Sequence, residues 1–283
     1  LMAQYFTERL QKVFHMIFRS YNQKAAQEGL RQLELIVNNQ QDAVSTHHRA
    51  LRNDMSTLLE SEINTKEDTL TIANDPEARE LGDAYALLAR VYAGPRFTWE
   101  ESNFPEDNMR TYQCLHDSIR RCSPIGTLQA LRIKGSITPT VEKDMQISFD
   151  DAFRIVHDYA EQDDAYCQYV IGNVFFWRDD NRIEAAKDMI MLPPLSLAKR
   201  IQRSLQSGSI HDRIAALQGT IPDEKLQENA SELAKRWLNK ALYNGLAMFQ
   251  GNLRNIYIDE GDFENARRVA RTAANLGNPA MML

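Results

Sequence analysis

Residues 234–245 read AKRWLNKALYNG, and residues 266–277 repeat the same spacing as ARRVARTAANLG. Each copy has a small residue first, a large apolar residue three positions later, a small or apolar pair at offsets seven and eight, and a final glycine. Offsets of three, seven and eight lie on one face of an α-helix. Because small residues beside a bulky one let a second helix approach closely, each copy predicts a helix packed tightly against another.

The same pattern occurs in two looser copies earlier in the chain. Their positions are Thr111, Cys114, Ser118-Ile119 and Cys122 in one copy, and Ala152, Ile155, Tyr159-Ala160 and Asp163 in the other. A unit of about 30–45 residues that recurs along a chain is typical of helical repeat arrays, which usually bind other proteins. The pattern therefore indicates a class of function without naming a partner.

A second motif precedes these helices. It reads LARVY at residues 88–92, IGNVF at 171–175 and LRNIY at 253–257, and a degenerate copy lies near 129–133. Each unit is thus interpreted as a first helix, a turn and a second helix. The turns are expected at Gly94, Gly135 and Gly261, because glycine adopts positive φ without a steric penalty.

These motifs resemble Sel1-like repeats, which are relatives of tetratricopeptide repeats. The segments that carry the resemblance are DAYALLARVYAGP, DAYCQYVIGNVFF, AKRWLNKALYNG and NARRVARTAANLGNPAM, within about residues 80–177 and 228–283. The resemblance implies an all-α fold, an α/α solenoid of about four helical hairpins. It also implies a role in building protein complexes, as in signalling, envelope assembly, secretion or host interaction.

Domain organisation follows from the composition along the chain. Residues 1–75 are expected to form long helices, and residues 76–283 the repeat array, with a helical insertion at about 178–228. Within residues 3–64 a heptad-like apolar spacing is consistent with a capping hairpin or with a self-associating coiled coil. An aromatic stripe near the N-terminus is interpreted as core, with membrane contact through this helix as the alternative. The stripe consists of Tyr5, Phe6, Phe14, Phe18 and Tyr21.

Charge and cysteine content limit the partners and the chemistry. The net charge of −6 argues against nucleic acid as the main partner, since phosphate binding needs a basic surface. No stretch of about 18 apolar residues is present, so no membrane span is expected. Cys114, Cys122 and Cys167 are interpreted as small buried residues. A Cys114–Cys122 disulfide stays open as an alternative that requires the helix to end near Ser118.

Sequence motifs for catalysis are missing. The chain has no glycine-rich phosphate loop, no paired-histidine zinc motif, no Cys-x-x-Cys and no serine elbow. We therefore expect no catalytic residue, no cofactor and no metal. Asp163 and Asp164 lie where a turn between helices is expected, and they are interpreted as helix caps.

The first helices of the units are expected to line a concave surface that binds a protein or peptide. Candidate groove residues occupy the variable positions of the second motif, and two aromatic residues of the loop at 94–108 are further candidates. The groove residues are Arg90, Asn173, Arg254 and Asn255, and the loop residues are Trp99 and Phe104.

We expect a non-enzymatic protein–protein interaction scaffold or adaptor. One alternative is a structural subunit of a bacterial envelope or secretion assembly that oligomerises through its N-terminal helices. Another is an enzyme or ligand-binding protein that uses residues 178–228 as a lid. A bacterial envelope location is favoured over the cytoplasm.

Overall fold

The computed structural model describes residues 4–51, 66–94, 102–130, 144–176 and 230–281. Every regular element within these ranges is a helix, so the expected all-α class is confirmed for the part of the chain that is described. The bounds of the α-helices are α1 Glu8–Phe18, α2 Gln23–Leu51, α4 Lys66–Asn74, α5 Glu80–Tyr92, α6 Asn108–Arg120, α7 Pro124–Ala130, α9 Phe149–Glu161, α10 Ala165–Phe176, α15 Ala230–Tyr243, α16 Gly251–Asp259 and α17 Phe263–Asn275. A short 3₁₀ turn, η3, spans Pro279–Met281.

Side-chain oxygens cap the starts of several helices. Asp107 accepts a hydrogen bond from the backbone N–H of Arg110 at the start of α6, and Asp262 accepts one from Asn265 at the start of α17. Thr7 caps α1 and Ser148 caps α9 in the same way. Each cap satisfies a backbone donor that the first turn of a helix leaves unpaired.

The four copies of the repeated pattern end in the same backbone conformation. The final positions are Cys122, Asp163, Gly245 and Gly277, and their φ values are 58°, 67°, 86° and 100°. In the last copy Gly277 donates to the carbonyl of Ala274 (2.9 Å), and Asn278 donates to that of Ala273 (3.0 Å). The equivalent two bonds close α6, α9 and α15. This Schellman motif shows that the register read from the sequence corresponds to a repeated helix end.

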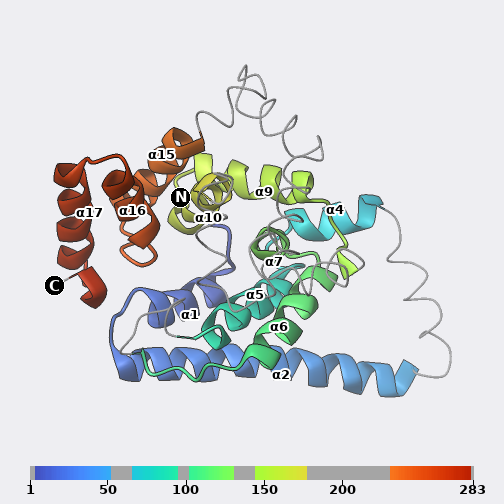
Figure 1. Ribbon diagram of the computed structural model, residues 1–283. Coiled ribbons are helices and arrows are strands. Elements are labelled where there is room, and N and C mark those ends of the chain that lie inside the picture. The colour runs from blue at the N-terminus through green and yellow to red at the C-terminus, as the bar shows by residue number, and fades with distance from the viewer. Residues whose placement is uncertain (1–3, 52–65, 95–101, 131–143, 177–229, 282–283) are drawn as a thin grey trace.

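The helices pack mainly in pairs (Figure 1). Close pairs are α1 with α2, α5 with α6, α9 with α10, α10 with α15, and α16 with α17. Gly172 of α10 faces α15, where a methyl group on its Cα would lie only 2.7 Å from Cγ of Leu238. The close approach expected at a small residue is therefore confirmed at this crossing.

The N-terminal helices are integrated into the core. The rings of Phe14 and Tyr166 lie 4.8 Å apart between α1 and α10, and Phe18 lies 5.9 Å from Phe249. The interpretation of the aromatic stripe as core is thus confirmed for Tyr5, Phe6, Phe14 and Phe18, which are buried. No helix among the ranges described is long and apolar enough to cross a membrane.

Several expectations concern residues outside the described ranges. The insertion at 178–228, the turn at Gly135 and the side chain of Trp99 lie there, as do residues 52–64 of the expected coiled coil. Self-association through residues 3–64 stays a prediction. All three cysteines are free and buried, which confirms their interpretation as core residues. The Cys114–Cys122 disulfide alternative is wrong.

Candidate functional site

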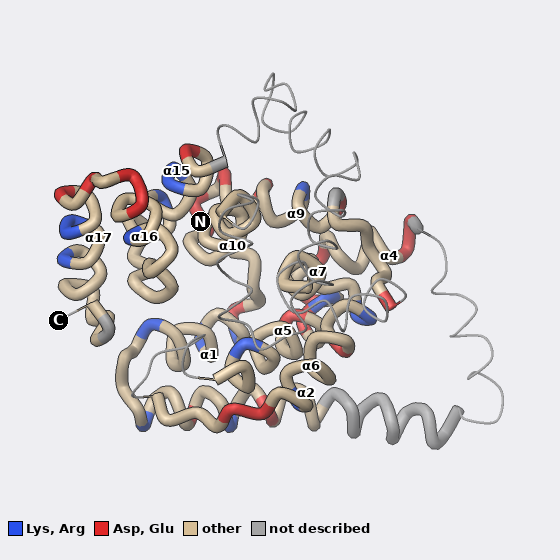
Figure 2. The backbone as a smooth tube through the Cα atoms, viewed as in Figure 1, with Lys and Arg blue, Asp and Glu red and all other residues tan. Residues whose placement is uncertain are grey.

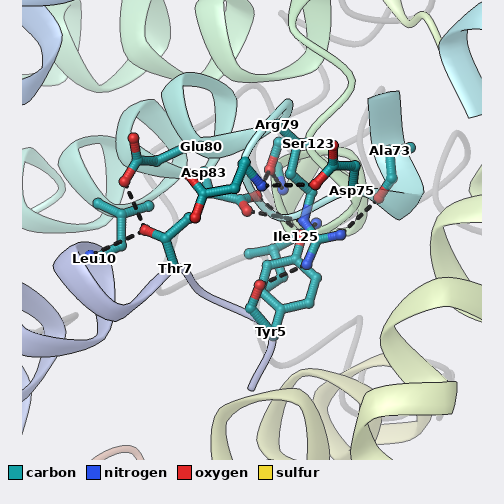
Figure 3. Close-up of polar contacts among 12 residues, drawn as sticks. Tyr5, Thr7, Leu10, Ala73, Asp75, Arg79, Glu80, Asp83, Ser123 and Ile125 are labelled. Carbon is teal, nitrogen blue, oxygen red and sulfur yellow. Dashed lines mark hydrogen bonds and ion pairs between the residues drawn. The ribbon is translucent and has the colours of Figure 1, made fainter. Parts of the chain in front are cut away.

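An extended stretch before α1 is held by a network of buried polar groups. We call residues 4–21, which include this stretch and α1, the N-terminal segment. Figure 3 shows polar contacts of Tyr5 and Thr7 within the network. Tyr5 is fully buried, its backbone N–H donates to Oδ2 of Asp164 (3.0 Å), and its backbone carbonyl accepts from Nη2 of Arg79. Its hydroxyl donates to Oδ1 of Asp83 (2.9 Å) and accepts from the backbone N–H of Ile125 (3.3 Å). The N–H, the carbonyl and the hydroxyl of one residue are therefore bound from the start of α5, from α7 and from the turn before α10.

Arg79 is the central cation of this network. Its Nε donates to Oδ2 of Asp83 (3.1 Å), and Nη1 donates to the carbonyl of Ala73 at the end of α4 (2.8 Å). The guanidinium carbon lies 4.0 Å from the centre of the Tyr5 ring. A planar guanidinium can bridge a carboxylate, two carbonyls and an aromatic face at once, which an ammonium cannot do in a fixed geometry.

Asp83 accepts from three groups while it is almost completely buried. Besides Arg79 and Tyr5, the hydroxyl of Ser123 donates to its Oδ1 at 2.7 Å. Burial raises the pKa of Asp83 to about 6, because the loss of water outweighs the attraction of Arg79 and the hydrogen bonds to the carboxylate. Ser123 in turn accepts from the backbone N–H of Gly126 (3.1 Å), so the network also fixes the start of α7.

After Tyr5, the N-terminal segment contacts Glu80 at the start of α5. Thr7 donates to Oε1 of Glu80 (2.6 Å), and Arg9 forms an ion pair with the same carboxylate. Arg9 and Glu80 also line an open hollow of about 850 Å³ beside α1. Carboxylates and cations alternate in this hollow, so its lining does not select a ligand of one charge.

The far end of the segment reaches the last helices. Nη2 of Arg19 donates to the carbonyl of Asn244 at the end of α15 (3.2 Å), and a methyl group on Gly277 would lie 2.9 Å from Cδ2 of Tyr21. The segment thus runs from the start of α5 to the end of α17, across helices that are far apart in sequence. It touches the side of α5 and α10 on which a peptide groove was expected.

The predicted groove residues do not form one exposed row. Arg90 is 7% exposed, donates to the hydroxyl of Tyr169 (2.7 Å) and lies 3.8 Å from the ring centre of Phe249. Asn173 is 6% exposed and accepts from Nδ2 of Asn252 (2.8 Å). Their expected accessible position does not hold, because Tyr169 and Phe249 pack against Arg90 and Asn252 of α16 contacts Asn173.

The other predicted residues differ in exposure. Arg254 is half-buried, and its Nη1 lies 3.7 Å from Sδ of Met281, whereas Asn255 is exposed. Phe104 is 4% exposed, so its ring is part of the core and not of a loop surface. Whether any of these residues binds a partner stays a prediction, and Trp99 lies outside the described ranges.

The residues that hold Tyr5 were not predicted from the sequence as a site. A signal was present in Arg79 and Asp83, a pair of opposite charges four residues apart at the start of a largely apolar helix. Asp164 was predicted as a cap, and it does cap α10 by accepting from the N–H of Cys167 (2.9 Å). Its second contact, with Tyr5, joins residues 159 positions apart, which local spacing does not reveal.

The polar groups at the centre of this network are closed to solvent. Ser123 and Asp83 have almost no exposed surface, so they contact no molecule from solvent while the N-terminal segment is in place. The network can fix the backbone and the side chain of a tyrosine. Comparison of the chain with protein-family models, with curated proteins and with solved structures finds no match.

Proposed function

We propose that this protein is a non-enzymatic scaffold that binds protein or peptide partners, and that its helical pairs form an α/α solenoid of Sel1-like repeats. The four equivalent helix ends and the close crossing of α10 with α15 support the repeat interpretation. The chemistry expected of such an array is recognition of extended or helical segments along its inner surface.

The observation that carries this proposal is the way the helices hold the N-terminal segment. Arg79 and Asp164 bind the backbone carbonyl and N–H of Tyr5, which any residue except proline would offer. Asp83 and the backbone of Ile125 bind its hydroxyl, which selects tyrosine. Backbone contacts for affinity and a side-chain pocket for specificity are the general means of peptide recognition.

Because the N-terminal segment covers the inner side of α5 and α10, a partner in this proposal uses surface further along the chain. Asn255 of α16 occupies the register of the expected groove and is exposed. Its amide can donate to and accept from a peptide backbone. Arg254 beside it is half-buried and carries a positive charge.

Capture of partner proteins on the immobilised full chain tests this proposal. In extracts of its native cells, Asn255→Glu should lose a partner that the wild-type chain retains. Asn38→Glu is a matched control, because Asn38 is exposed on α2, away from α16. Equal retention by both variants, or no protein retained above an unrelated column, would refute a partner site at α16.

A structural subunit of a bacterial envelope or secretion assembly is the second candidate. Its support is α2, a helix of 29 residues that extends past α5 and α6 in Figure 1. A helix of this length offers more surface than one helical pair covers. Sedimentation of the full chain tests it, since a strictly monomeric mass at high concentration would remove oligomerisation through the N-terminal helices.

A further inference from the structure

Positive side chains gather on the two last helices of the repeat pattern. Arg236 on α15 and Arg268 on α17 occupy the same position of the pattern, as do Lys235 and Arg267. Figure 2 shows Lys and Arg on both helices. We call five of these residues the C-terminal basic face: Arg236, Lys240, Arg267, Arg268 and Arg271.

This face is continuous between the two helices. Nη2 of Arg268 donates to Oδ1 of Asn239 on α15 (3.0 Å), which places α17 directly beside the turn that carries Arg236 and Lys240. On α17, Arg271 follows Arg267 by four residues and Arg268 by three, so the three side chains share one side of the helix.

Among the residues described, no ion pair within 4.0 Å involves the C-terminal basic face, whereas Lys235 beside it pairs with both Glu232 and Glu260. Arg236 and Lys240 instead lie 5.6 Å and 4.6 Å from the ring of Trp237. Arg236, Arg267, Arg268 and Arg271 are exposed, so their charges are available to a partner.

An acidic border at one end of the face limits the length of a partner that can bind there. Carboxylates at the turn between α16 and α17 lie at one end, as the red segments of Figure 2 show. These carboxylates are Asp259, Glu260, Asp262 and Glu264. A long polyanion such as nucleic acid would be repelled there, and the net charge of −6 would oppose it further. A short acidic segment can bind the face without extending to these carboxylates.

An aromatic side chain next to the face adds an apolar contact. Tyr243 is 90% exposed at the end of α15, three residues after Lys240. Tyrosine and arginine are enriched among the residues that contribute most of the binding energy in protein interfaces. We propose that the C-terminal basic face, with Tyr243, binds a short Asp- and Glu-rich segment of a partner protein. This inference rests on the scaffold function proposed above, because it names the chemistry of one partner.

Fluorescence anisotropy with a labelled peptide of alternating Asp and Glu tests the inference on the full chain. The double variant Arg236→Glu/Arg271→Glu should weaken binding about tenfold, because each reversal removes an attraction and adds a repulsion of several tenths of a kcal/mol. The neutral variant Arg236→Gln/Arg271→Gln should weaken binding by about half as much on a logarithmic scale, because it removes the attractions without adding repulsions. Higher salt should weaken wild-type binding in the same direction.

The matched control is Lys12→Glu/Lys24→Glu, which makes the same change of net charge on α1 and α2, where both lysines are exposed. Binding by this control should stay within about twofold of wild type, because neither lysine lies on α15 or α17 and salt screens exposed charges. Equal weakening by both double variants would overturn the inference, as would absence of peptide binding by the wild-type chain.

A single-stranded oligonucleotide serves as the competing probe. Tighter binding of the oligonucleotide than of the peptide, with the same loss in the Arg236/Arg271 variants, would assign the face to nucleic acid and overturn the inference. If the peptide does not bind but partner capture still depends on Asn255, only this inference is refuted. Failure of both experiments would remove the scaffold function as well.

Discussion

The Asp83 carboxyl should contribute a pH dependence of stability whose sign is opposite to that of most buried, ion-paired carboxylates. Replacement of Asp83 by Asn should remove this contribution. The Asp83 carboxyl lies among Arg79, Tyr5 and Ser123 with about 1% of its surface exposed. Burial raises its pKa from the ordinary 3.8 to about 6. Between these two values the folded chain holds a proton that the unfolded chain has released.

The sign and the size of the effect follow from this difference. A folded pKa above the unfolded one gives stability that is complete below about pH 4 and is lost as the pH rises through about 6. A shift of about two pH units corresponds to about 3 kcal/mol. Asn cannot titrate, so the variant should lack this loss. The stability of wild type relative to Asp83→Asn should therefore fall by about 3 kcal/mol between pH 4 and pH 7.

Urea unfolding followed by circular dichroism at a series of pH values measures the difference. Asp144→Asn is a control of opposite sign. Burial alone would raise the pKa of Asp144, but hydrogen bonds from His116 and Arg120 lower it on balance. Its contribution should shrink as the pH falls below about 4. A wild-type advantage over Asp83→Asn that grows with pH would refute the reasoning, because it would mean that Arg79 dominates over burial.

Three further changes test the packing. Tyr5→Phe should cost about 1–3 kcal/mol in urea unfolding, because buried partners of the hydroxyl lose their hydrogen bond; an unchanged midpoint would contradict the network. Gly172→Ala should cost about 1–3 kcal/mol, since the new methyl group meets a leucine of α15. Gly251→Ala, where no atom lies within 4 Å of the new methyl group, should be neutral or stabilising by up to about 1 kcal/mol. The thiols should be unreactive to a thiol reagent in the native state, because burial raises the pKa of Cys114 to about 12 and that of Cys122 to about 11; a count below three in urea would indicate a disulfide.

The helix pattern could be predicted because it depends on local spacing. The offsets that defined the four copies also supply the carbonyls of the closing turns, so a pattern of side chains located the ends of α6, α9, α15 and α17. The non-glycine copies, Cys122 and Asp163, adopt the same positive φ as Gly245 and Gly277. Aspartate tolerates this conformation well, while cysteine adopts it only where the surrounding packing imposes it.

Exposure at the candidate site could not be predicted in the same way. The burial of Arg90 and Asn173 depends on which segment lies over the helix. Phe249 lies against Arg90 and Asn252 contacts Asn173, and both are distant in sequence from the residues they cover. Spacing within one helix gives the face of a residue and says nothing of a covering element. The same limit explains why the contacts of Tyr5 were not foreseen.

The burial of Arg90 affects where the proposed scaffold would bind a partner. A guanidinium placed against the rings of Tyr169 and Phe249 is as closely held as Arg79 against Tyr5. A partner would have to displace these contacts to reach either cation. Contacts at α16 and α17 require no such replacement. For this reason exposed residues at the C-terminal end, and not the buried ones in the same register, are the better sites for a partner.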